Sequence, residues 1–347
     1  MISDPAPTSL DAVLSPPWLS RALGTSFPGV EVTHSEPVEV LRTVATKVRF
    51  TIDCAPMSGP TPPAALCVKA YFDRADQGYT GGETEGAFYR EMAKTLPVRT
   101  PACLYVGSDT STGHTLVLMR DLTAEGSTFL TALTPYSVDE AAATLDQLAL
   151  LHASHWNDQG LYSLPWLASR VARIPDSFPI EQLQSQLDGR RGGPLPAVIR
   201  DAGRLDAAMR KLGQDDDPTS VCVVHGDAHA GNVFVTSAGL PGLIDWQIAH
   251  RGSWATDVAY HIGAVLDVDE RQRSEKELLR HYLGRLGAHG VQPPGWEQAW
   301  EKYRQYLAYG YYLWGITRFV DEDITVEFVK RLGTAVAQHK TFEAIGV

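Results

Sequence analysis

The sequence predicts an α+β protein built from two lobes. The chain has 347 residues, which is more than one typical domain holds and enough for two hydrophobic cores. Short apolar runs bounded by turn residues dominate its first third and predict strands, whereas the later part has the spacing of apolar residues that helices show. We place the boundary after residue 122, with a strand-rich lobe at 1–122 and a mainly helical lobe at 123–347.

Three strands are predicted early in the first lobe, at residues 31–41, 46–53 and 64–72. The first two bracket a turn, Arg42–Thr46, that contains no glycine. Lys69 is the only charge in the third strand. A lysine inside an apolar run is costly to bury unless an anion meets it, although lysine also protects exposed edge strands from pairing. The sequence leaves both explanations open.

A helix is predicted at residues 83–96, opened by Gly81-Gly82 and closed by Pro97. Its buried stripe has i, i+3, i+4, i+7 spacing and comprises Glu85, Phe88, Tyr89 and Met92. A buried glutamate needs a cation, and Lys69 is the available one. Glu83 and Glu91 fall off the stripe, so we predict a Lys69–Glu85 ion pair.

The second lobe begins with a capping box, Ser137–Glu140, that opens a helix. Further helical segments are expected at 180–212, interrupted near 189–196, and Asp215–Asp217 is expected to be a solvated turn. An aromatic-rich helix follows at 300–314. Such a helix either lines a substrate pocket or belongs to the core, and aromatic content alone favours the core.

The most informative segment is His225-Gly226-Asp227-Ala228-His229-Ala230-Gly231-Asn232, which follows an apolar strand at 220–224. We expect strands at 232–235 and 242–246, joined by a turn at 236–241. A hairpin centred on that turn pairs residues whose numbers sum to 477, which places Asn232 opposite Asp245. Their side chains would then lie on one face at cross-strand distance.

This arrangement suits phosphoryl transfer. Two oxygen ligands side by side favour a hard cation such as Mg²⁺, and Asp227 is left nearby to take a proton from an incoming hydroxyl. Asp and Asn beside strands are also common turn residues, but three of them around one loop favour a site. We expect His225 to donate to a backbone carbonyl, and His229 either to contact a phosphate or to pack.

The pattern His225-Gly226-Asp227-x-His229-x-x-Asn232, followed by Ile244-Asp245-Trp246, resembles the aminoglycoside phosphotransferase superfamily, which also includes choline kinases. The flanking residues 242–247 and 257–260 most resemble its ecdysteroid-kinase-like branch. The resemblance extends from about Glu31 to Trp314. It implies a protein-kinase-like fold, with an antiparallel sheet and one helix in the first lobe and ATP between the lobes.

The resemblance also implies a role for each residue. Asp227 would be the catalytic base, Asn232 and Asp245 the Mg²⁺ ligands, and Asp257 the brace below the catalytic loop. The Lys69–Glu85 pair would hold the phosphates of ATP or GTP. Further nucleotide contacts would come from the glycine-free turn and from the connector at 116–122, namely Thr43, Thr46, Met119 and Asp121.

Composition limits the partners. The net charge of −11 argues against a nucleic-acid surface, and no apolar run reaches membrane length. The four cysteines show no CxxC spacing, and the proline-rich start lacks a signal-peptide pattern. We therefore expect a cytoplasmic enzyme acting on a small-molecule alcohol. The acceptor and the oligomeric state are not predicted.

Two other classes stay open. A metallohydrolase can use a Gly226-Asp227-x-His229 segment, but it needs further Asp and His clusters upstream, which this sequence lacks. A catalytically silent nucleotide-binding protein is the second alternative. It has no chemical need for the complete set, which comprises Lys69, Glu85, Asp227, Asn232 and Asp245.

Overall fold

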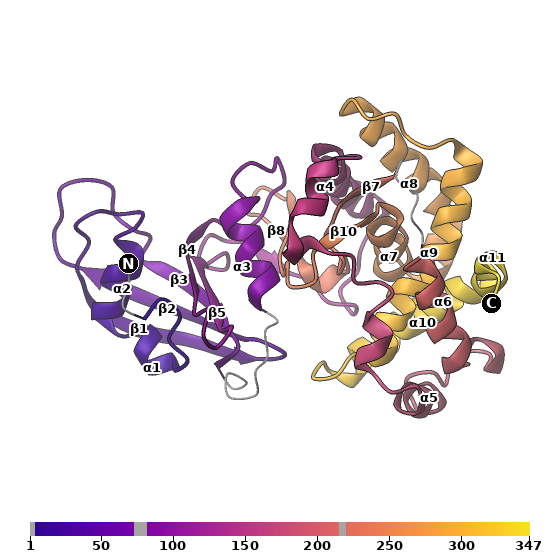
Figure 1. The fold of residues 1–347 in the computed structure, drawn as a ribbon, viewed down its shortest axis with the longest axis horizontal. Coiled ribbons are helices and arrows are strands. Elements are labelled where there is room, and N and C mark those ends of the chain that lie inside the picture. The colour runs from indigo at the N-terminus through magenta and orange to yellow at the C-terminus, as the bar shows by residue number, and fades with distance from the viewer. Residues whose placement is uncertain (1–3, 73–81, 215–219) are drawn as a thin grey trace. The chain divides into compact units, whose positions relative to one another are not determined.

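The computed structural model describes residues 4–72, 82–214 and 220–347 (Figure 1). Gly81 and Asp215–Asp217, for which we made predictions, lie outside the described residues. The chain divides into two compact units. The first comprises Met1–Thr95 and Thr100–Thr128, and the second comprises Leu96–Arg99 and Phe129–Val347.

The first unit is built on a five-stranded antiparallel sheet with the order β1-β2-β3-β5-β4. Its strands are β1 (Val32–Arg42), β2 (Thr46–Cys54), β3 (Ala65–Ala70), β4 (Cys103–Ser108) and β5 (Thr115–Arg120). Because β3 lies between β2 and β5, it is an interior strand of this sheet. Its lysine therefore does not protect an exposed edge.

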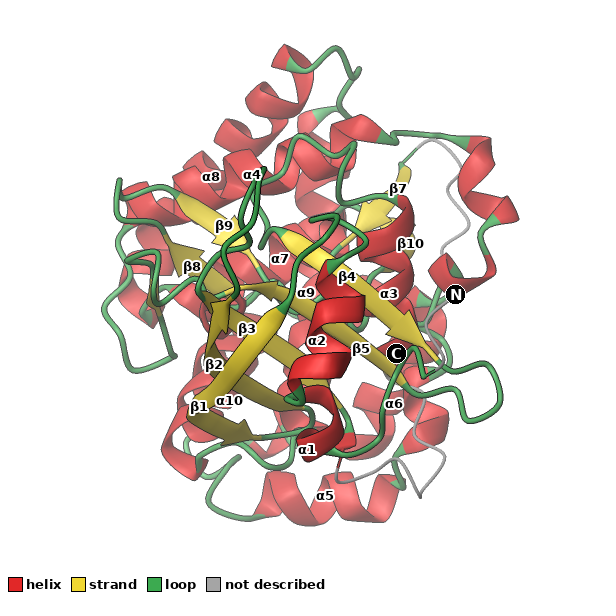
Figure 2. Cartoon of the chain, turned by 90° about the vertical axis from the view of Figure 1, so that its left-hand side faces the viewer, coloured by secondary structure: helices red, strands yellow, loops and turns green. Residues whose placement is uncertain are grey.

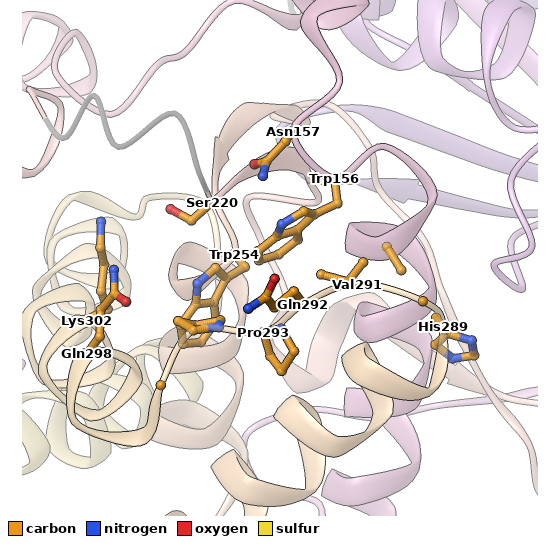
Figure 3. Close-up of a pocket in the computed structure, with 14 residues that line it drawn as sticks. Trp156, Asn157, Ser220, Trp254, His289, Val291, Gln292, Pro293, Gln298 and Lys302 are labelled. Carbon is orange, nitrogen blue, oxygen red and sulfur yellow. The ribbon is translucent and has the colours of Figure 1, made fainter.

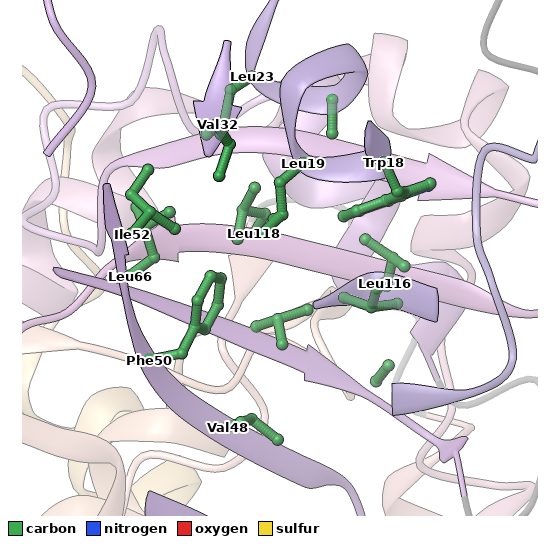
Figure 4. Packing of buried hydrophobic residues seen from close by; sticks show 14 of the residues in the cluster. Trp18, Leu19, Leu23, Val32, Val48, Phe50, Ile52, Leu66, Leu116 and Leu118 are labelled. Atoms are coloured by element: carbon green, nitrogen blue, oxygen red, sulfur yellow. The ribbon is translucent and has the colours of Figure 1, made fainter. Parts of the chain in front are cut away.

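One face of this sheet carries the core of the first unit. Side chains at alternate positions of β2, β3 and β5, such as Phe50, Leu66 and Leu118, are fully buried. They pack against two short helices, α1 (Leu10–Val13) and α2 (Pro16–Leu23), which lie over the sheet (Figures 2 and 4). We predicted no element in this N-terminal segment, yet Trp18 of α2 is one of its largest buried side chains.

The helix of the first unit, α3 (Gly82–Glu91), packs against β4 and β5. It ends five residues earlier than we predicted. The N–H groups of Met92 and Ala93 both donate to the carbonyl of Phe88, so the helix closes there in a turn. The predicted buried stripe is nevertheless present, because Glu85, Phe88 and Tyr89 are buried while Glu83 and Glu91 are exposed.

The second unit is mainly helical. Its helices are α4 (Val138–Ser154), α5 (Ile180–Asp188), α6 (Ala202–Leu212), α7 (Ala255–Val265), α8 (Val268–Ala288), α9 (Trp296–Ile316), α10 (Glu322–Gln338) and α11 (Thr341–Ile345). Short 3₁₀ turns occur at Gln159–Ser163, Pro165–Leu167, Ile174–Ser177, Ala197–Ile199 and Ala230–Asn232. The predicted capping box at the start of α4 is formed, with Ser137 and Glu140 bonding each other's backbone.

Helix α7 is the centre of the second unit. All of its residues are buried, including the polar Asp257 and His261, and it contacts α4, α8, α9 and α10. The aromatic-rich helix α9 is also largely buried. The core interpretation of that helix is therefore correct for most of its tyrosines, although two of its residues also reach the loop described below.

The motif residues lie in the loops that follow the strands of two antiparallel pairs. Strand β7 (Val221–Val224) pairs with β10 (His250–Ser253), and β8 (Val233–Val235) pairs with β9 (Pro241–Leu243); β6 (Thr128–Phe129) is a two-residue strand. Among the described residues, none of the helices combines the length and apolar character that crossing a lipid bilayer requires.

Candidate functional site

The loop after β7 is held from below by one buried carboxylate. Asp257, in the first turn of α7, accepts the N–H of His225 at 2.7 Å and the N–H of Gly226 at 2.8 Å. Burial raises the pKa of Asp257, but the hydrogen bond and charge of His152, together with the Gly226 N–H, lower it further than burial raises it. Asp257 is thus an ionised anchor for the loop backbone, the brace that we predicted.

His152 completes this anchor, and sequence reasoning missed it. Its Nε2 lies 3.0 Å from Asp257 Oδ2, and its Nδ1 lies 2.7 Å from the hydroxyl of Tyr282 on α8. His152 and Asp257 are both fully buried. A histidine in the last turn of a helix is more often a packing residue than part of a site, so the position of His152 gives no signal. No local pattern marks it, because its partners lie 105 and 130 residues away.

Two further side chains fix the carbonyl groups of the loop. The Tyr309 hydroxyl of α9 donates to the carbonyl of Gly226 at 2.8 Å. His261 Nδ1 of α7 lies 2.8 Å from the carbonyl of Ala228. Burial lowers the pKa of His261 to about 4, so its ring is neutral at pH 7 and donates through Nδ1–H. The loop backbone is therefore held from both α7 and α9.

His225 joins this loop to the segment that carries Asp245. Its Nε2 lies 2.9 Å from the carbonyl of Ile244, and its Nδ1 accepts the N–H of Asp227 at 3.2 Å. Since Nδ1 accepts, Nε2 must carry the proton and donate. This is the shaping bond to a carbonyl that we expected. With both nitrogens engaged, the ring has no lone pair left for a metal.

The Asp227 carboxylate is held at both oxygens. The Tyr260 hydroxyl donates to Oδ1 at 3.1 Å, and Asn232 Nδ2 donates to Oδ2 at 2.9 Å and to the Asp227 carbonyl at 2.9 Å. The side chain is still 17% exposed. Each oxygen keeps a second lone pair, so the carboxylate is oriented but can accept a proton.

The predicted hairpin register is wrong by one residue. Val233 pairs with Leu243 and Val235 with Pro241, so partner numbers sum to 476 instead of 477. The N–H of Ile244 donates to the carbonyl of Asn232 at 3.0 Å. Asp245 lies one residue beyond that bond, with φ of 68°. The positive φ turns the chain out of the strand, so Asp245 is not a cross-strand partner of Asn232.

Asn232 and Asp245 are nevertheless a suitable donor set for a hard cation. The two bonds from Asn232 Nδ2 fix the amide, so that its Oδ1 accepts nothing from the residues that the structure describes. Asp245 lies one residue beyond the backbone bond to Asn232 and is partly exposed. A carbonyl and a carboxylate oxygen are ligands that Mg²⁺ accepts, with water and phosphate oxygens completing its shell.

His229 lies beside Asp227 and packs against several aromatic rings. Its Nδ1 accepts the N–H of Gly231 at 3.0 Å, and its Nε2 lies 3.6 Å from Asp227 Oδ1. The ring packs edge-on against Trp314 of α9 and Phe328 of α10 at centroid distances of 5.0 and 5.2 Å. Both of our alternatives for His229, contact with a ligand and packing, are compatible with this placement.

In the first unit, Lys69 and Glu85 form a buried ion pair. The distance from Lys69 Nζ to Glu85 Oε2 is 2.6 Å, and the two side chains are 4% and 3% exposed. Burying such a pair costs desolvation that only good geometry and further partners offset. A pair of this kind on an interior strand is thus weak evidence for stability and points to a function.

Other charged groups share the Lys69 face of the sheet. Lys47 lies directly opposite Lys69 across β2 and β3, and Arg49 is opposite Cys67. Burial, and to a smaller extent Asp121, raise the pKa of Cys67 to about 11, although the charges of Lys47, Lys69 and Arg49 lower it. Like charges directly opposite each other are destabilising, so this face is suited to an anion.

Of the remaining residues predicted to contact the nucleotide, some lie on the Lys69 face of the sheet and others do not. Met119 pairs with Cys67 in the sheet and lies on the Lys69 face. Asp121 is buried, and Arg49 Nε donates to its two oxygens at 3.1 and 3.0 Å. The hydroxyl of Thr43 donates a hydrogen bond to the carbonyl of Ala45. Thr46 lies on the core face by strand alternation and is 4% exposed. The threonine hydroxyls are therefore poor candidates for phosphate donors.

A hollow of about 600 Å³ in the second unit contains none of the predicted site residues (Figure 3). The end of α4, the connection between α8 and α9, and the start of α9 line it, with Trp156, Trp254, Gln292 and Lys302 among the lining residues.

Gly226 is expected to be irreplaceable in this loop. It has φ of +82°, and a Cβ there would lie 2.5 Å from the carbonyl oxygen of Ile248. Gly226→Ala should lower the free energy of unfolding by more than the ~1–2 kcal/mol of left-handed strain. The control is Gly239→Ala, with φ of +76° and no atom within 4 Å of a Cβ. Urea denaturation compares them, and equal losses would contradict the expected clash.

A comparison with known families decides the class. The model of the "Phosphotransferase enzyme family" matches residues 66–306, which include both the Lys69 strand and the motif loop. The chain belongs to this family. The resemblance stated above is thereby confirmed at the family level, and the protein is an enzyme that transfers phosphoryl groups. Its branch within the family stays a prediction.

Solved structures show the same α+β, kinase-like fold for this phosphotransferase. A choline kinase from Cryptosporidium parvum Iowa II has a TM-score of 0.55 at 11% identity, covering 97% of this chain and 94% of its own. The GDP complex of an aminoglycoside 2'-phosphotransferase-IIIa has a TM-score of 0.52 at 14% identity, covering 93% and 99%. No curated protein matches the phosphotransferase significantly.

Proposed function

We propose that this phosphotransferase moves the γ-phosphoryl group of ATP or GTP to a hydroxyl group of a small molecule. Residues 1–122 would bind the nucleotide, and residues 123–347 would carry the catalytic loop and the acceptor. The observation that carries the proposal is the Asp227 carboxylate, oriented at both oxygens and still accessible. A structural aspartate has no need of that combination.

In this mechanism, the oxygen of the acceptor hydroxyl bonds to the γ-phosphorus, and Asp227 accepts the proton of that hydroxyl. The bond from phosphorus to the bridging oxygen breaks, and the nucleoside diphosphate leaves with that electron pair. The Asn232 carbonyl and the Asp245 carboxylate would hold Mg²⁺, which neutralises phosphate charge when bound. Lys69, kept in place by Glu85, would hold the phosphates from the first unit.

A nucleotide base needs backbone groups that are not already bonded. The N–H of Leu122, in the predicted connector, donates to no acceptor among the described residues, whereas its carbonyl accepts the N–H of Ser127. We propose Leu122 N–H as a contact for the base, with Met119 beneath the ring. Asp121 would then support the connector through Arg49 and the N–H of Thr123, without touching the nucleotide.

A polycationic acceptor would need several available carboxylates, and four acidic residues of the second unit are engaged elsewhere. Glu322 and Asp323 pair with Arg190, Asp267 pairs with Arg331, and Asp321 caps α10. This pairing favours an acceptor with few positive charges. The solved structures named as a choline kinase and an aminoglycoside phosphotransferase act on small molecules, which supports a small-molecule acceptor without deciding its charge. The four free cysteines suit the reducing cytoplasm that we propose as its location.

The alternative of a silent nucleotide-binding protein leaves the oriented Asp227 without a purpose. A measurement of ADP release distinguishes the phosphotransferase from a silent nucleotide-binding protein. The protein should release ADP from ATP only when one alcohol of a panel is present, the panel comprising sugars, aminoglycosides, macrolides, choline-like amines, sterols and hydroxyacyl thioesters. Protection by nucleotide with no ADP release across the panel would favour the silent protein.

Removal of divalent cations is expected to abolish that turnover, since the proposed ligand set holds Mg²⁺ against the phosphates. EDTA should stop ADP release, and added Mg²⁺ should restore it. Asn232→Ala and Asp245→Ala should each raise the Mg²⁺ concentration needed for half-maximal rate by at least about tenfold, a loss typical of one missing ligand contact of ~1.4 kcal/mol. An unchanged Mg²⁺ requirement in both variants would contradict the assignment.

A further inference from the structure

The bonding of His229 fixes which of its nitrogens carries a proton. The N–H of Gly231 points at Nδ1 at 3.0 Å, so Nδ1 must be the acceptor. A neutral imidazole with an accepting Nδ1 is protonated at Nε2. His229 therefore presents an N–H donor on the side of the ring that faces away from the 3₁₀ turn at Ala230–Asn232.

Among the residues that the structure describes, none accepts a hydrogen bond from that donor. Asp227 Oδ1 lies 3.6 Å from His229 Nε2, which is too long for a hydrogen bond. The ring cannot turn toward it easily, because Trp314 and Phe328 pack on it and Tyr260 lies 6.0 Å away on a third side. The His229 side chain is 12% exposed, so a ligand can reach Nε2.

Asp227 Oδ1 is the complementary half of the arrangement. It accepts one hydrogen bond, from Tyr260, and keeps a lone pair. A free N–H donor and a free carboxylate lone pair 3.6 Å apart match a hydroxyl group, which donates one proton and accepts at its oxygen. An oxygen at about 2.8 Å from both atoms fits between them.

We propose that His229 binds the oxygen of the acceptor hydroxyl through Nε2–H and so aims its proton at Asp227 Oδ1. This inference rests on the proposed function and deepens it. The two oxygens of the Asp227 carboxylate then have different roles. Oδ2 faces Asn232 and the proposed cation. Oδ1 faces His229, Tyr260 and the acceptor. The oxygen stays free to attack along its other lone pair.

Two substitutions separate this role from capping of the 3₁₀ turn. In His229→Asn the amide oxygen replaces Nδ1 and keeps the cap, but the distal donor is lost. In His229→Gln the amide nitrogen replaces Nε2 and keeps the donor, but the cap is lost. Circular dichroism and the melting temperature confirm that both variants fold. Should one fail to fold, the nitrogen spectra described below still decide on the wild-type protein.

The rates are measured with the panel alcohol that the wild-type protein uses fastest. His229→Asn should lower kcat/KM for the acceptor by about 10²-fold, the cost of a misaligned reacting group, with KM for ATP unchanged. His229→Gln should stay within about tenfold of wild type, a loss of ~1.4 kcal/mol. The opposite order, or equal rates, would leave His229 as a cap only and overturn the inference.

A second readout needs no acceptor. Nitrogen-15 NMR of the wild-type imidazole rings at neutral pH, with the His229 signals assigned as those missing from the spectrum of whichever variant folds, should show a protonated Nε2 and an unprotonated Nδ1. A protonated Nδ1 would overturn the inference. Complete absence of ATP turnover in the wild-type protein would overturn the proposed function itself, whereas turnover with the wrong order of variants overturns this inference alone.

Discussion

Asp227→Asn is expected to lower turnover by about 10³-fold, within the range that a general base contributes. The amide is nearly isosteric with the carboxylate but cannot take a proton. Its oxygen can still accept from Asn232, and its NH₂ group can donate to the Tyr260 hydroxyl, which then acts as acceptor. The loop should keep its shape, so nucleotide affinity should be unchanged.

Turnover is measured from the rate of ADP release, and nucleotide affinity is measured separately by titration calorimetry. Asp139→Asn, an exposed position in the first turn of α4, makes the same chemical change away from the loop and should leave turnover intact. If Asp227→Asn retained turnover within a few-fold of wild type, Asp227 would not be the base.

Asp257→Asn is expected to have the largest effect on stability. The carboxylate accepts three hydrogen bonds, from two backbone N–H groups and from His152. An amide offers one oxygen and brings its own N–H donors into a buried site, so at least one of those donors loses its acceptor. The free energy of unfolding should fall by about 3 kcal/mol, and turnover should fall with it because the loop loses its anchor.

The pH dependence of this loss follows from the lowered pKa of Asp257. A carboxyl group with a lower pKa in the folded state stabilises the protein above the pKa of the unfolded chain, about 3.9, and this contribution disappears as pH falls through the folded value. The difference between wild type and Asp257→Asn should thus be constant at neutral pH and shrink below about pH 4. Urea denaturation at several pH values measures it. A difference that does not change with pH would argue that Asp257 is not ionised in the folded protein.

The features that sequence predicted well are those encoded locally. The Lys69 strand, the stripe that buries Glu85 and the capping box at Ser137 each depend on residues within about two helical turns of one another. The ion pair between Lys69 and Glu85 spans 16 positions, but it followed from the rule that a buried charge requires a partner. That rule chose Glu85 over Glu83 and Glu91, both of which are exposed.

The hairpin register was missed for a geometric reason. The turn closes through the N–H of Thr236 on the carbonyl of Leu240, with Gly239 in a left-handed conformation, so the pairing is centred half a residue earlier than a symmetric six-residue turn would place it. A one-residue slip reverses the face of every side chain. The face of Asp245 is not set by the register, because the positive φ of this residue turns the chain out of the strand.

The supports of the loop could not be found from sequence. His152, Tyr260 and Tyr309 each contact the loop or its anchor from helices 33 to 105 positions away. Nothing in their local spacing separates them from core residues. Only the packing of α4, α7 and α9 around the loop brings their polar atoms to it.

The most direct test of the central claim is the fate of the γ-phosphate. Phosphorus-31 NMR of a reaction containing the protein, Mg²⁺, ATP and the preferred alcohol should show ADP and a new phosphate monoester of that alcohol in equal amounts, with neither formed by Asp227→Asn. Inorganic phosphate as the sole product in the presence of every alcohol, or an ester that forms equally well without the Asp227 carboxylate, would contradict the account.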